Sequence, residues 1–310
     1  MDQTLSFQPE LIHTPEQLEL LASQAVEGFI IGLHKSPFHG FSVEFAEHRL
    51  YNPGEPTKNL DWKVFARSDR MYIKRFEEET NLRCQLVIDQ SSSMFYPMEK
   101  GRLSKYQFSV LCAAALVNLL QRQRDASGLS LFSDTIRLQT EARSSRVHRQ
   151  MIYTRLTEQL HYEEKNHPSE MAKCLHQIAE NIHRRSLVIL FSDMLDCTDE
   201  QKAGSIYEAL RHLRFNRHEV VLFQVTDHTE ELDFIFDDRP YEFIDLESGE
   251  KIKIQPNQIK SSYLEKMEAF QHQLKLKCGQ SKIDLYEADI RKGFQPVLSS
   301  FLTKRSRIKK

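Results

Sequence analysis

The sequence predicts an α/β fold built on a doubly wound, mostly parallel sheet. Three nearly continuous apolar segments, residues 83–89, 186–192 and 218–225, are typical of strands that are buried on both faces. Longer segments whose apolar residues recur at helical spacing lie between them along the chain. An alternation of such strands and helices indicates a parallel sheet with helices on both faces.

An N-terminal extension precedes the expected core and covers residues 1–80. Residues 15–33 have helical spacing, and a capping threonine, a proline and an acid at their start favour a helix. Residues 34–80 are polar and irregular, and we expect short strands over 41–45 and 71–76. The extension is therefore predicted to contain one helix and a few short strands.

The core is expected over residues 81–230, and residues 231–310 continue the same fold. Between the buried strands we expect, in order, a helix over 103–124, a strand pair over 128–132 and 135–140, and helices over 145–160, 169–183 and 199–215. The C-terminal part is expected to hold a hairpin insert over 232–255, a helix over 256–278, a strand over 283–286 and a helix over 295–302.

Composition and charge argue against several classes of protein. The formal net charge of −2 gives no support to nucleic-acid binding, and no apolar run approaches the roughly 18 residues of a membrane span. The N-terminus lacks a basic segment followed by an apolar one, so no signal peptide is expected. The five cysteines are scattered, odd in number and never spaced as C-x-x-C, which fits a reducing compartment. We therefore expect a cytoplasmic protein without a membrane span.

The end of the first buried strand carries the strongest functional signal. Asp89 is followed there by Ser91 and Ser93, and Asp193 comes directly after the second buried strand. Ligands of open α/β sheets bind at the carboxyl ends of strands, so neighbouring strands would bring both carboxylates to one edge. Ser169, which opens an expected helix, is the candidate hydroxyl from a third loop. These hard oxygen ligands suit Mg²⁺ better than zinc, with Mn²⁺ or Ca²⁺ as alternatives.

Each of these residues also has a structural interpretation. A strand-end aspartate followed by serines can cap a following helix or form an Asx-turn, and Ser169 alone is more often a cap than a ligand. Met94, Phe95, Tyr96 and Met98 either form an apolar, partner-binding rim around the metal or pack beneath it, and the loop-like sequence there favours the rim. Two aspartates at the ends of two buried strands, taken together, favour a site.

The spacing of the candidate ligands resembles a known metal site. The pattern Asp89-x-Ser91-x-Ser93, with a later hydroxyl and then Asp193, is similar to the metal-ion-dependent adhesion site of von Willebrand factor A domains. The resemblance implies a von Willebrand factor A-like, Rossmann-type core in which the metal binds a partner's acidic side chain.

Upstream segments resemble one bacterial family more specifically. Segments 44–45, 49–55, 60–68 (Leu-Asp-Trp-Lys-Val-Phe-Ala-Arg-Ser) and 72–79 are similar to the hallmark of the domain of unknown function 58 family, in which they lead into an A-type domain. The resemblance runs from about residue 36 to 230, and it implies genes that accompany MoxR-type AAA+ ATPases and no established catalytic activity. The sequence departs from the family at the third ligand, where His-Pro-Ser-Glu, ending in Ser169-Glu170, replaces a segment similar to Gly-Gly-Thr-Asp.

These features predict a non-enzymatic protein-binding module that works with a MoxR-type AAA+ ATPase in assembly or regulation. One alternative is a structural scaffold that binds no metal. A Mg²⁺-dependent hydrolase is less favoured, because the Gly-x-Ser-x-Gly and P-loop motifs are absent. Ser91 also stands where a phosphotransferase with Asp89 as nucleophile would have a second acid.

Overall fold

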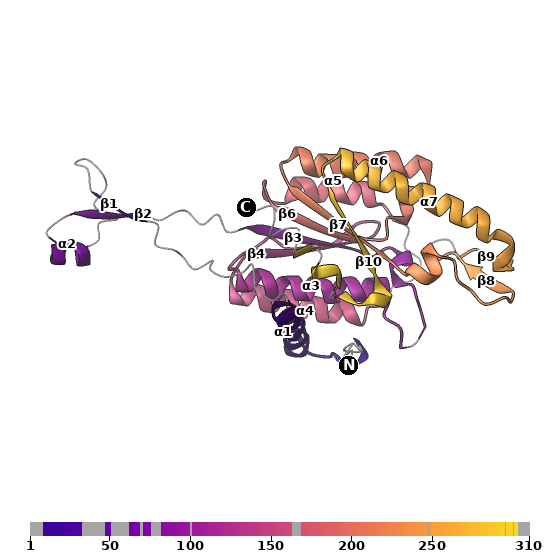
Figure 1. Cartoon of the computed structure of the whole chain (residues 1–310), viewed down its shortest axis with the longest axis horizontal. Coiled ribbons are helices and arrows are strands. Elements are labelled where there is room, and N and C mark those ends of the chain that lie inside the picture. Colours follow the sequence, from indigo (N-terminus) through magenta and orange to yellow (C-terminus); the bar gives the residue numbers. More distant parts are fainter. Residues whose placement is uncertain are drawn as a thin grey trace. The chain divides into compact units, whose positions relative to one another are not determined.

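The computed structural model describes most of the chain, shown in Figure 1. The described residues are 9–32, 47–50, 62–68, 71–75, 82–99, 101–162, 169–246, 249–294, 296–299 and 301–302. The chain divides into two compact units, residues 1–34 with 82–310 and residues 35–81. The N-terminal helix therefore groups with the sheet, whereas the expected boundary at residue 80 grouped it with the short strands.

Six strands form the central sheet in the spatial order β10–β7–β6–β3–β4–β5. Their bounds are β3 Arg83–Asp89, β4 Ala126–Phe132, β5 Ile136–Gln139, β6 Leu187–Ser192, β7 Glu219–Thr226 and β10 Asp284–Asp289. All neighbouring pairs are parallel except β4–β5, which is antiparallel as the predicted strand pair required. The doubly wound, mostly parallel sheet is confirmed, and β3, β6 and β7 are buried along nearly their whole length.

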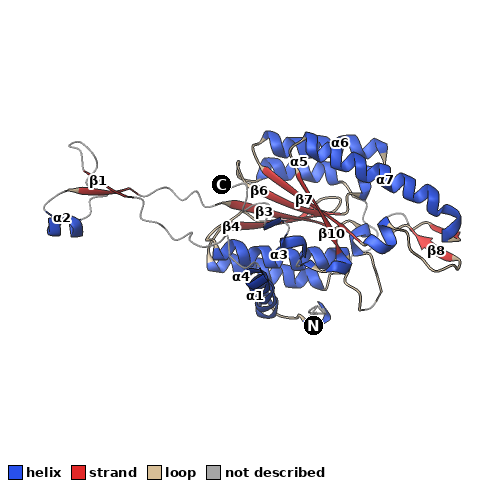
Figure 2. Ribbon diagram, in the orientation of Figure 1, coloured by secondary structure: helices blue, strands red, loops and turns tan. Residues whose placement is uncertain are grey.

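Helices cover both faces of this sheet, as Figures 1 and 2 show. One layer holds α1 Pro15–Gly32, α3 Lys105–Arg122 and α4 Arg146–Leu160, and the other holds α5 Met171–Asn181, α6 Glu200–Phe215 and α7 Pro256–Gln280. The start of α3 follows from its sequence, because Ser104 and Gln107 form a reciprocal capping box. The described residues among 294–302 are helical, as expected for the last helix.

Short elements surround the carboxyl edge of the sheet. They are the 3₁₀ turns η3 Ser92–Phe95, η4 Leu195–Thr198 and η6 Ile290–Lys292, the π-helical turn η5 His228–Leu232, and the hairpin strands β8 Tyr241–Ile244 and β9 Lys251–Ile254. A further 3₁₀ turn, η1 Pro9–Leu11, precedes α1. The hairpin confirms the expected insert, but these single turns are too short to leave a periodic signal in the sequence.

The second unit has its own small antiparallel pair. Strand β1 Glu47–Leu50 pairs with β2 Tyr72–Arg75, and the helix α2 Trp62–Ser68 lies between them in sequence. The short strand expected near residues 71–76 is confirmed, whereas the one expected over 41–45 lies outside the described residues.

The strand order places a crevice between β3 and β6. From β3 the chain moves to β4 on one side, and it later enters β6 on the other side. Such a reversal is the topological switch point at which open α/β sheets bind ligands beyond the carboxyl ends of the strands. The two strands with the predicted aspartates are therefore direct neighbours, with Ile88 paired to Phe191.

Among the described helices, none is both long enough and apolar enough to span a membrane.

Candidate functional site at the carboxyl edge of the sheet

Four neighbouring parallel strands each end at an aspartate. Asp89 and Asp289 are the last residues of β3 and β10, and Asp193 and Asp227 directly follow β6 and β7. Because the strands stand in the order β10–β7–β6–β3, these carboxylates form a row along one edge. Their neighbours differ, so the four carboxylates differ in chemistry.

Asp89 is fully buried at the crevice. Its Oδ1 accepts a hydrogen bond from the backbone N–H of Ser91 at 2.9 Å, and its Oδ2 accepts one from the Ser192 hydroxyl at 2.7 Å. Burial, with a smaller contribution from the negative charge of Asp193, raises the pKa of Asp89 to about 7. Among the residues that the structure describes, Asp89 has no partner in an ion pair, so its charge is left without a neighbouring cation.

Serine hydroxyls border this carboxylate. The Oγ atoms of Ser91 and Ser93 lie 3.2 Å apart, on the loop directly after β3. Ser169 is buried beside the end of β4, the other neighbour of β3, where the N–H of Glu170 donates to the carbonyl of Ser133 at 3.1 Å. The Ser169 Oγ has no hydrogen-bond partner among the described residues, and it does not cap α5. A buried hydroxyl without a partner in the fold is free to contact a bound ligand.

Asp193 has a cation of its own. The Lys105 ammonium, which is fully buried, lies 2.8 Å from Asp193 Oδ2 and 2.5 Å from Glu231 Oε1. Burial opposes the charged form, but the two carboxylates more than compensate and raise the pKa of Lys105. The second oxygen of Asp193 accepts the N–H of Leu195 at 3.0 Å. Lys105 therefore ties the candidate metal site to the η5 turn.

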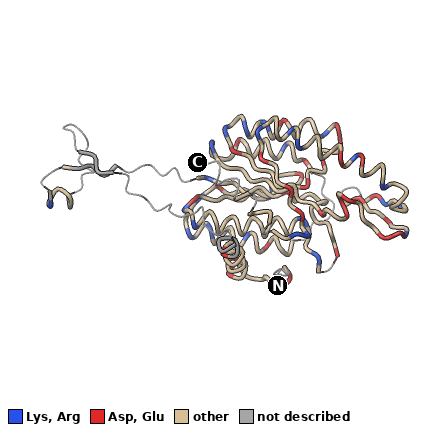
Figure 3. The backbone as a smooth tube through the Cα atoms, viewed as in Figure 1, with Lys and Arg blue, Asp and Glu red and all other residues tan. Residues whose placement is uncertain are grey.

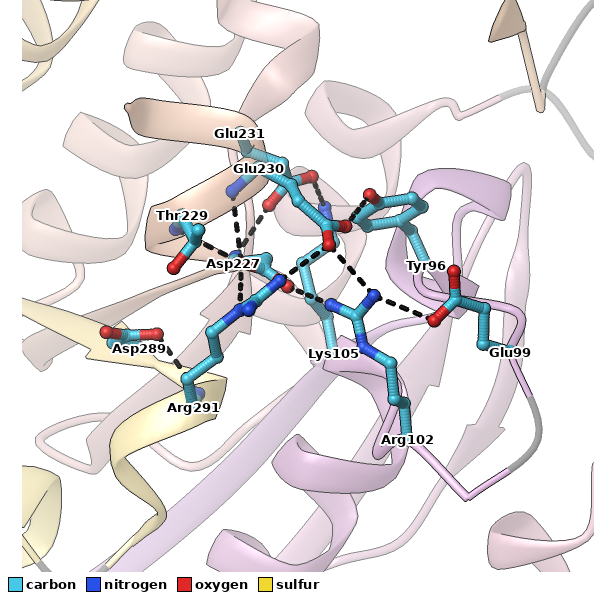
Figure 4. Close-up of polar contacts among 10 residues, drawn as sticks. All are labelled: Tyr96, Glu99, Arg102, Lys105, Asp227, Thr229, Glu230, Glu231, Asp289 and Arg291. Carbon is cyan, nitrogen blue, oxygen red and sulfur yellow. Dashed lines mark hydrogen bonds and ion pairs between the residues drawn. The ribbon is translucent and has the colours of Figure 1, made fainter. Parts of the chain in front are cut away.

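Asp227, which follows β7, is neutralised by two arginines, as Figure 4 shows. Buried Asp227 accepts from Arg102 Nη2 at 2.5 Å and from Arg291 Nε at 2.6 Å. Glu230 accepts from the same two arginines, at 2.9 Å and 2.6 Å, and from the Tyr96 hydroxyl. Both carboxylates of this cluster are paired with arginines, so the cluster stabilises the edge of the sheet and does not call for a metal ion.

The residues at the crevice fit a magnesium ion. Two carboxylates and three hydroxyls are hard oxygen donors, and each ionised carboxylate oxygen can still accept a further contact. The unpartnered Ser169 hydroxyl and the charge of Asp89 are the observations that a cation would satisfy. Within the described ranges, no group of three or more His, Cys, Asp or Glu side chains could hold a metal ion, so a site here depends on the serines.

The structure corrects part of the predicted rim. Met94 is fully buried beneath the loop and cannot contact a partner. Phe95 packs against Tyr106 in a tilted arrangement with ring centroids 4.9 Å apart, and Tyr96 donates to Glu230, so both also support the loop. Met98, which is 68% exposed, is the apolar residue that the loop presents to solvent. Met94 packs inward from the 3₁₀ turn η3, whereas Phe95 and Tyr96 are half-buried and Tyr96 lines the groove that begins at Ser93.

A groove of about 1120 Å³ begins at Ser93 and continues toward the β8–β9 hairpin. Its walls include the exposed side chains of Met98, Ile235 and Ile244. Aromatic rings line the hairpin side, where Phe234 lies 4.3 Å from Tyr263 between ring centroids. The groove thus joins the candidate metal site to an apolar surface.

Lys105 and Ser192 are the functional neighbours that sequence reasoning missed. Ser192 directly precedes Asp193, and this adjacency was the available signal. Lys105 stands 88 residues from its partner Asp193, near the start of a helix, and no local pattern marks it.

Fold and site together define a doubly wound α/β protein with carboxylates and hydroxyls at its switch point. The chain belongs to the family described as "Protein of unknown function DUF58", whose model matches residues 47–273. The family resemblance is thereby confirmed, and the match extends beyond residue 230 into α7. The A-type domain and the MoxR association that the resemblance implied stay predictions.

Relatives and solved structures are similar at low identity. Uncharacterized proteins of Mycobacterium tuberculosis and Mycobacterium bovis are 25% identical over 219 residues, which is 71% of this chain and 66% of each relative. A conserved hypothetical protein BatB from Bacteroides thetaiotaomicron matches 73% of this chain and 99% of its own, with 15% identity and a TM-score of 0.44. An aerotolerance-related membrane protein from Bacteroides fragilis matches 73% and 98%, with 12% identity and a TM-score of 0.41.

Proposed function

We propose that this protein is a Mg²⁺-dependent, non-enzymatic binding module that engages an acidic side chain of a partner protein. The observation that carries the proposal is the state of Asp89: a buried carboxylate without an ion-pair partner among the described residues, beside two hydroxyls. Burying an uncompensated charge is costly, and a bound cation would remove that cost.

Each ligand has a role that the contacts support. Ser91 and Ser93 supply hydroxyl oxygens, Ser169 supplies the third-loop hydroxyl, and Asp89 and Asp193 supply negative charge. Bound there, Mg²⁺ offers a positive centre with open positions for a partner's carboxylate, and Mn²⁺ or Ca²⁺ can replace it. Ser192 and the Ser91 N–H hold Asp89 in place.

The groove supplies the remaining contact area. A partner segment whose carboxylate reaches Ser93 continues along the groove past Met98, Ile235 and Ile244. Apolar side chains of that segment can pack on the aromatic hairpin, which gives specificity that a metal–carboxylate bond alone lacks. The partner class implied by the family resemblance is a MoxR-type AAA+ ATPase.

One observation favours a metal-free scaffold as the second candidate. The Lys105 ammonium already neutralises Asp193 from inside the fold, 2.8 Å from its Oδ2. An internal cation in that place could serve structure alone. Asp89 distinguishes the two candidates, because Lys105 forms its ion pairs with Asp193 and Glu231 instead.

A thermal-melting titration tests the proposal. Mg²⁺ should raise the melting temperature of the wild type, since a ligand that binds only the folded state stabilises it. Asp89→Asn should abolish this shift, and its melting temperature without metal should exceed that of the wild type, because a buried uncompensated charge is removed. Asp199→Asn is the matched control: it removes an exposed carboxylate nearby, and asparagine keeps the α6 cap.

Partner capture completes the test. Immobilised wild type should retain a MoxR-type ATPase in Mg²⁺ and release it in EDTA, while Asp89→Asn should not retain it. A metal shift that persists in Asp89→Asn, or no shift in the wild type up to millimolar Mg²⁺, would favour the scaffold.

A further inference from the structure

A row of basic residues occupies the opposite edge of the sheet, where the strands begin. Arg124, Arg185, Arg217 and Lys282 each stand two residues before a parallel strand, namely β4, β6, β7 and β10. Arg83 opens β3, which lies between β6 and β4. We call these five residues the basic rim. Neighbouring strands lie about 4.8 Å apart, so the sheet order sets five positive charges side by side.

Four members of the rim hold an unfavourable backbone conformation. Their φ angles are 59°, 61°, 65° and 53° in chain order, in the left-handed region where glycine is the usual residue. A basic side chain near a helix C-terminus is favoured by the helix dipole, which offsets part of the cost at each position. The helix dipole alone does not explain why a basic residue in the left-handed conformation recurs before four strands of the same sheet.

The rim is open to solvent. All five side chains are exposed, and within the described part of the chain Arg124, Arg185, Arg217 and Lys282 form no ion pair. Figure 3 shows blue segments at this end of the sheet and red ones along the β8–β9 hairpin. Acids near the rim, Asp125, Glu219 and Asp284, have contacts of their own.

Large apolar side chains stand at the same edge. Phe215 is 84% exposed at the end of α6, two residues before Arg217. Val147 is 82% exposed in the first turn of α4, which starts at this edge because Arg143 pairs with Ser127 at the beginning of β4. Exposed apolar residues among basic ones are typical of surfaces that dip into the headgroup layer of a membrane.

We propose that the basic rim docks the protein on an anionic phospholipid surface. The positive charges meet acidic headgroups, while Phe215 enters the boundary between headgroups and acyl chains. A nucleic acid would satisfy the charges but would leave Phe215 and Val147 without an apolar environment. Docking goes beyond the proposed metal-dependent binding, and the two surfaces can act together because they lie at opposite ends of strands about 20 Å long.

Vesicle co-sedimentation of the full chain tests docking. Wild type should bind phosphatidylcholine vesicles that contain phosphatidylglycerol, less so at high salt, and should not bind pure phosphatidylcholine. The variant with Arg124, Arg185, Arg217 and Lys282 all changed to glycine should bind at least tenfold more weakly, since each basic residue contributes on the order of fivefold. Glycine suits the left-handed conformation, so this variant should melt no lower than the wild type.

Two controls separate the explanations. Changing Arg239, Lys251, Lys253 and Lys266 to glutamine removes the same charge elsewhere and should leave vesicle binding unchanged. Phe215→Ser should weaken binding without affecting the fold, and Asp89→Asn should bind vesicles like the wild type. Equal losses in the glycine and glutamine variants, or binding to duplex DNA but not to vesicles, would overturn the proposal.

Discussion

At the scale of single residues, the environment of each strand-end aspartate decides what it can do. Asp227 and Asp193 each lie within 2.8 Å of a basic nitrogen, whereas the described residues hold Asp89 by hydrogen bonds from Ser91 and Ser192 and by no ion pair. Identical side chains at equivalent strand ends therefore differ in whether they need a cation. Burial raises the pKa of Asp89, which means that its charged form is disfavoured in the absence of a cation.

Lys105 should be essential to stability. Lys105→Met leaves the Asp193 and Glu231 carboxylates close together without their ammonium, and breaking a buried pair in this way costs about 3–5 kcal/mol. Denaturant unfolding measures the loss. Adding Glu231→Gln to the variant should recover part of it, because one of the two unpaired charges is removed.

Lys202→Met is the matched control for this prediction. Lys202 pairs with Asp196 at 3.0 Å but is 44% exposed, so its loss should cost less than about 1 kcal/mol. Equal stability of the two lysine variants would show that Lys105 does not hold the site together.

At the scale of elements, the periodicity of apolar residues predicted the longer strands and helices. The predicted strand over residues 83–89 matches β3 residue for residue, and α3, α4 and α6 lie within three residues of their predicted ends. The turns η3 and η5 were not predicted, and η3 is the reason that Met94 points inward. Lys105 was missed because its carboxylate partners come from loops far along the chain.

The β8–β9 hairpin should open independently of the central sheet. It forms a separate two-stranded sheet, and Phe243 anchors it. The Phe243 ring stacks on Phe234 with centroids 6.0 Å apart and meets Phe236 edge-to-face with centroids 5.4 Å apart. Each aromatic pair contributes about 0.5–1.5 kcal/mol, so Phe243→Ala should raise hydrogen exchange in the hairpin roughly tenfold. Exchange in β3 and β6 should not change.

The neighbouring residue provides the control for the hairpin. Ile244 points to the other face of the strand and is 48% exposed, so Ile244→Ala should leave exchange close to that of the wild type. Faster exchange in the central sheet of Phe243→Ala would mean that hairpin and sheet unfold as one unit.

At the scale of the whole molecule, a net charge of −2 conceals a strongly polarised unit. Aspartates close four parallel strands at the carboxyl edge, and basic residues open the strands of the same sheet at the other edge. The net charge gave no support to nucleic-acid binding, but a net charge is a sum over both edges of the sheet and does not show that their charges differ. The equivalent ends of parallel strands lie at the same edge of the sheet. A charged residue that recurs at each strand end therefore forms one charged surface.

In mild acid His218 should destabilise the fold, in the opposite sense to Asp89, whose raised pKa favours the folded state as the pH falls. This histidine is fully buried at the base of β7, and its Nδ1 accepts the Ser186 N–H at 3.2 Å, which requires an unprotonated nitrogen. Burial lowers the pKa of His218 below its usual value of 6.5. The unfolded chain therefore binds this proton more readily, and stability present above about pH 6.5 is lost as the pH falls further. Between about pH 7 and pH 5 the denaturant midpoint of the wild type should fall relative to that of His218→Asn, which keeps an acceptor without a titrating group. Exposed His272→Asn should follow the wild type. A His218→Asn protein with the wild-type pH dependence would assign the acid sensitivity to other groups.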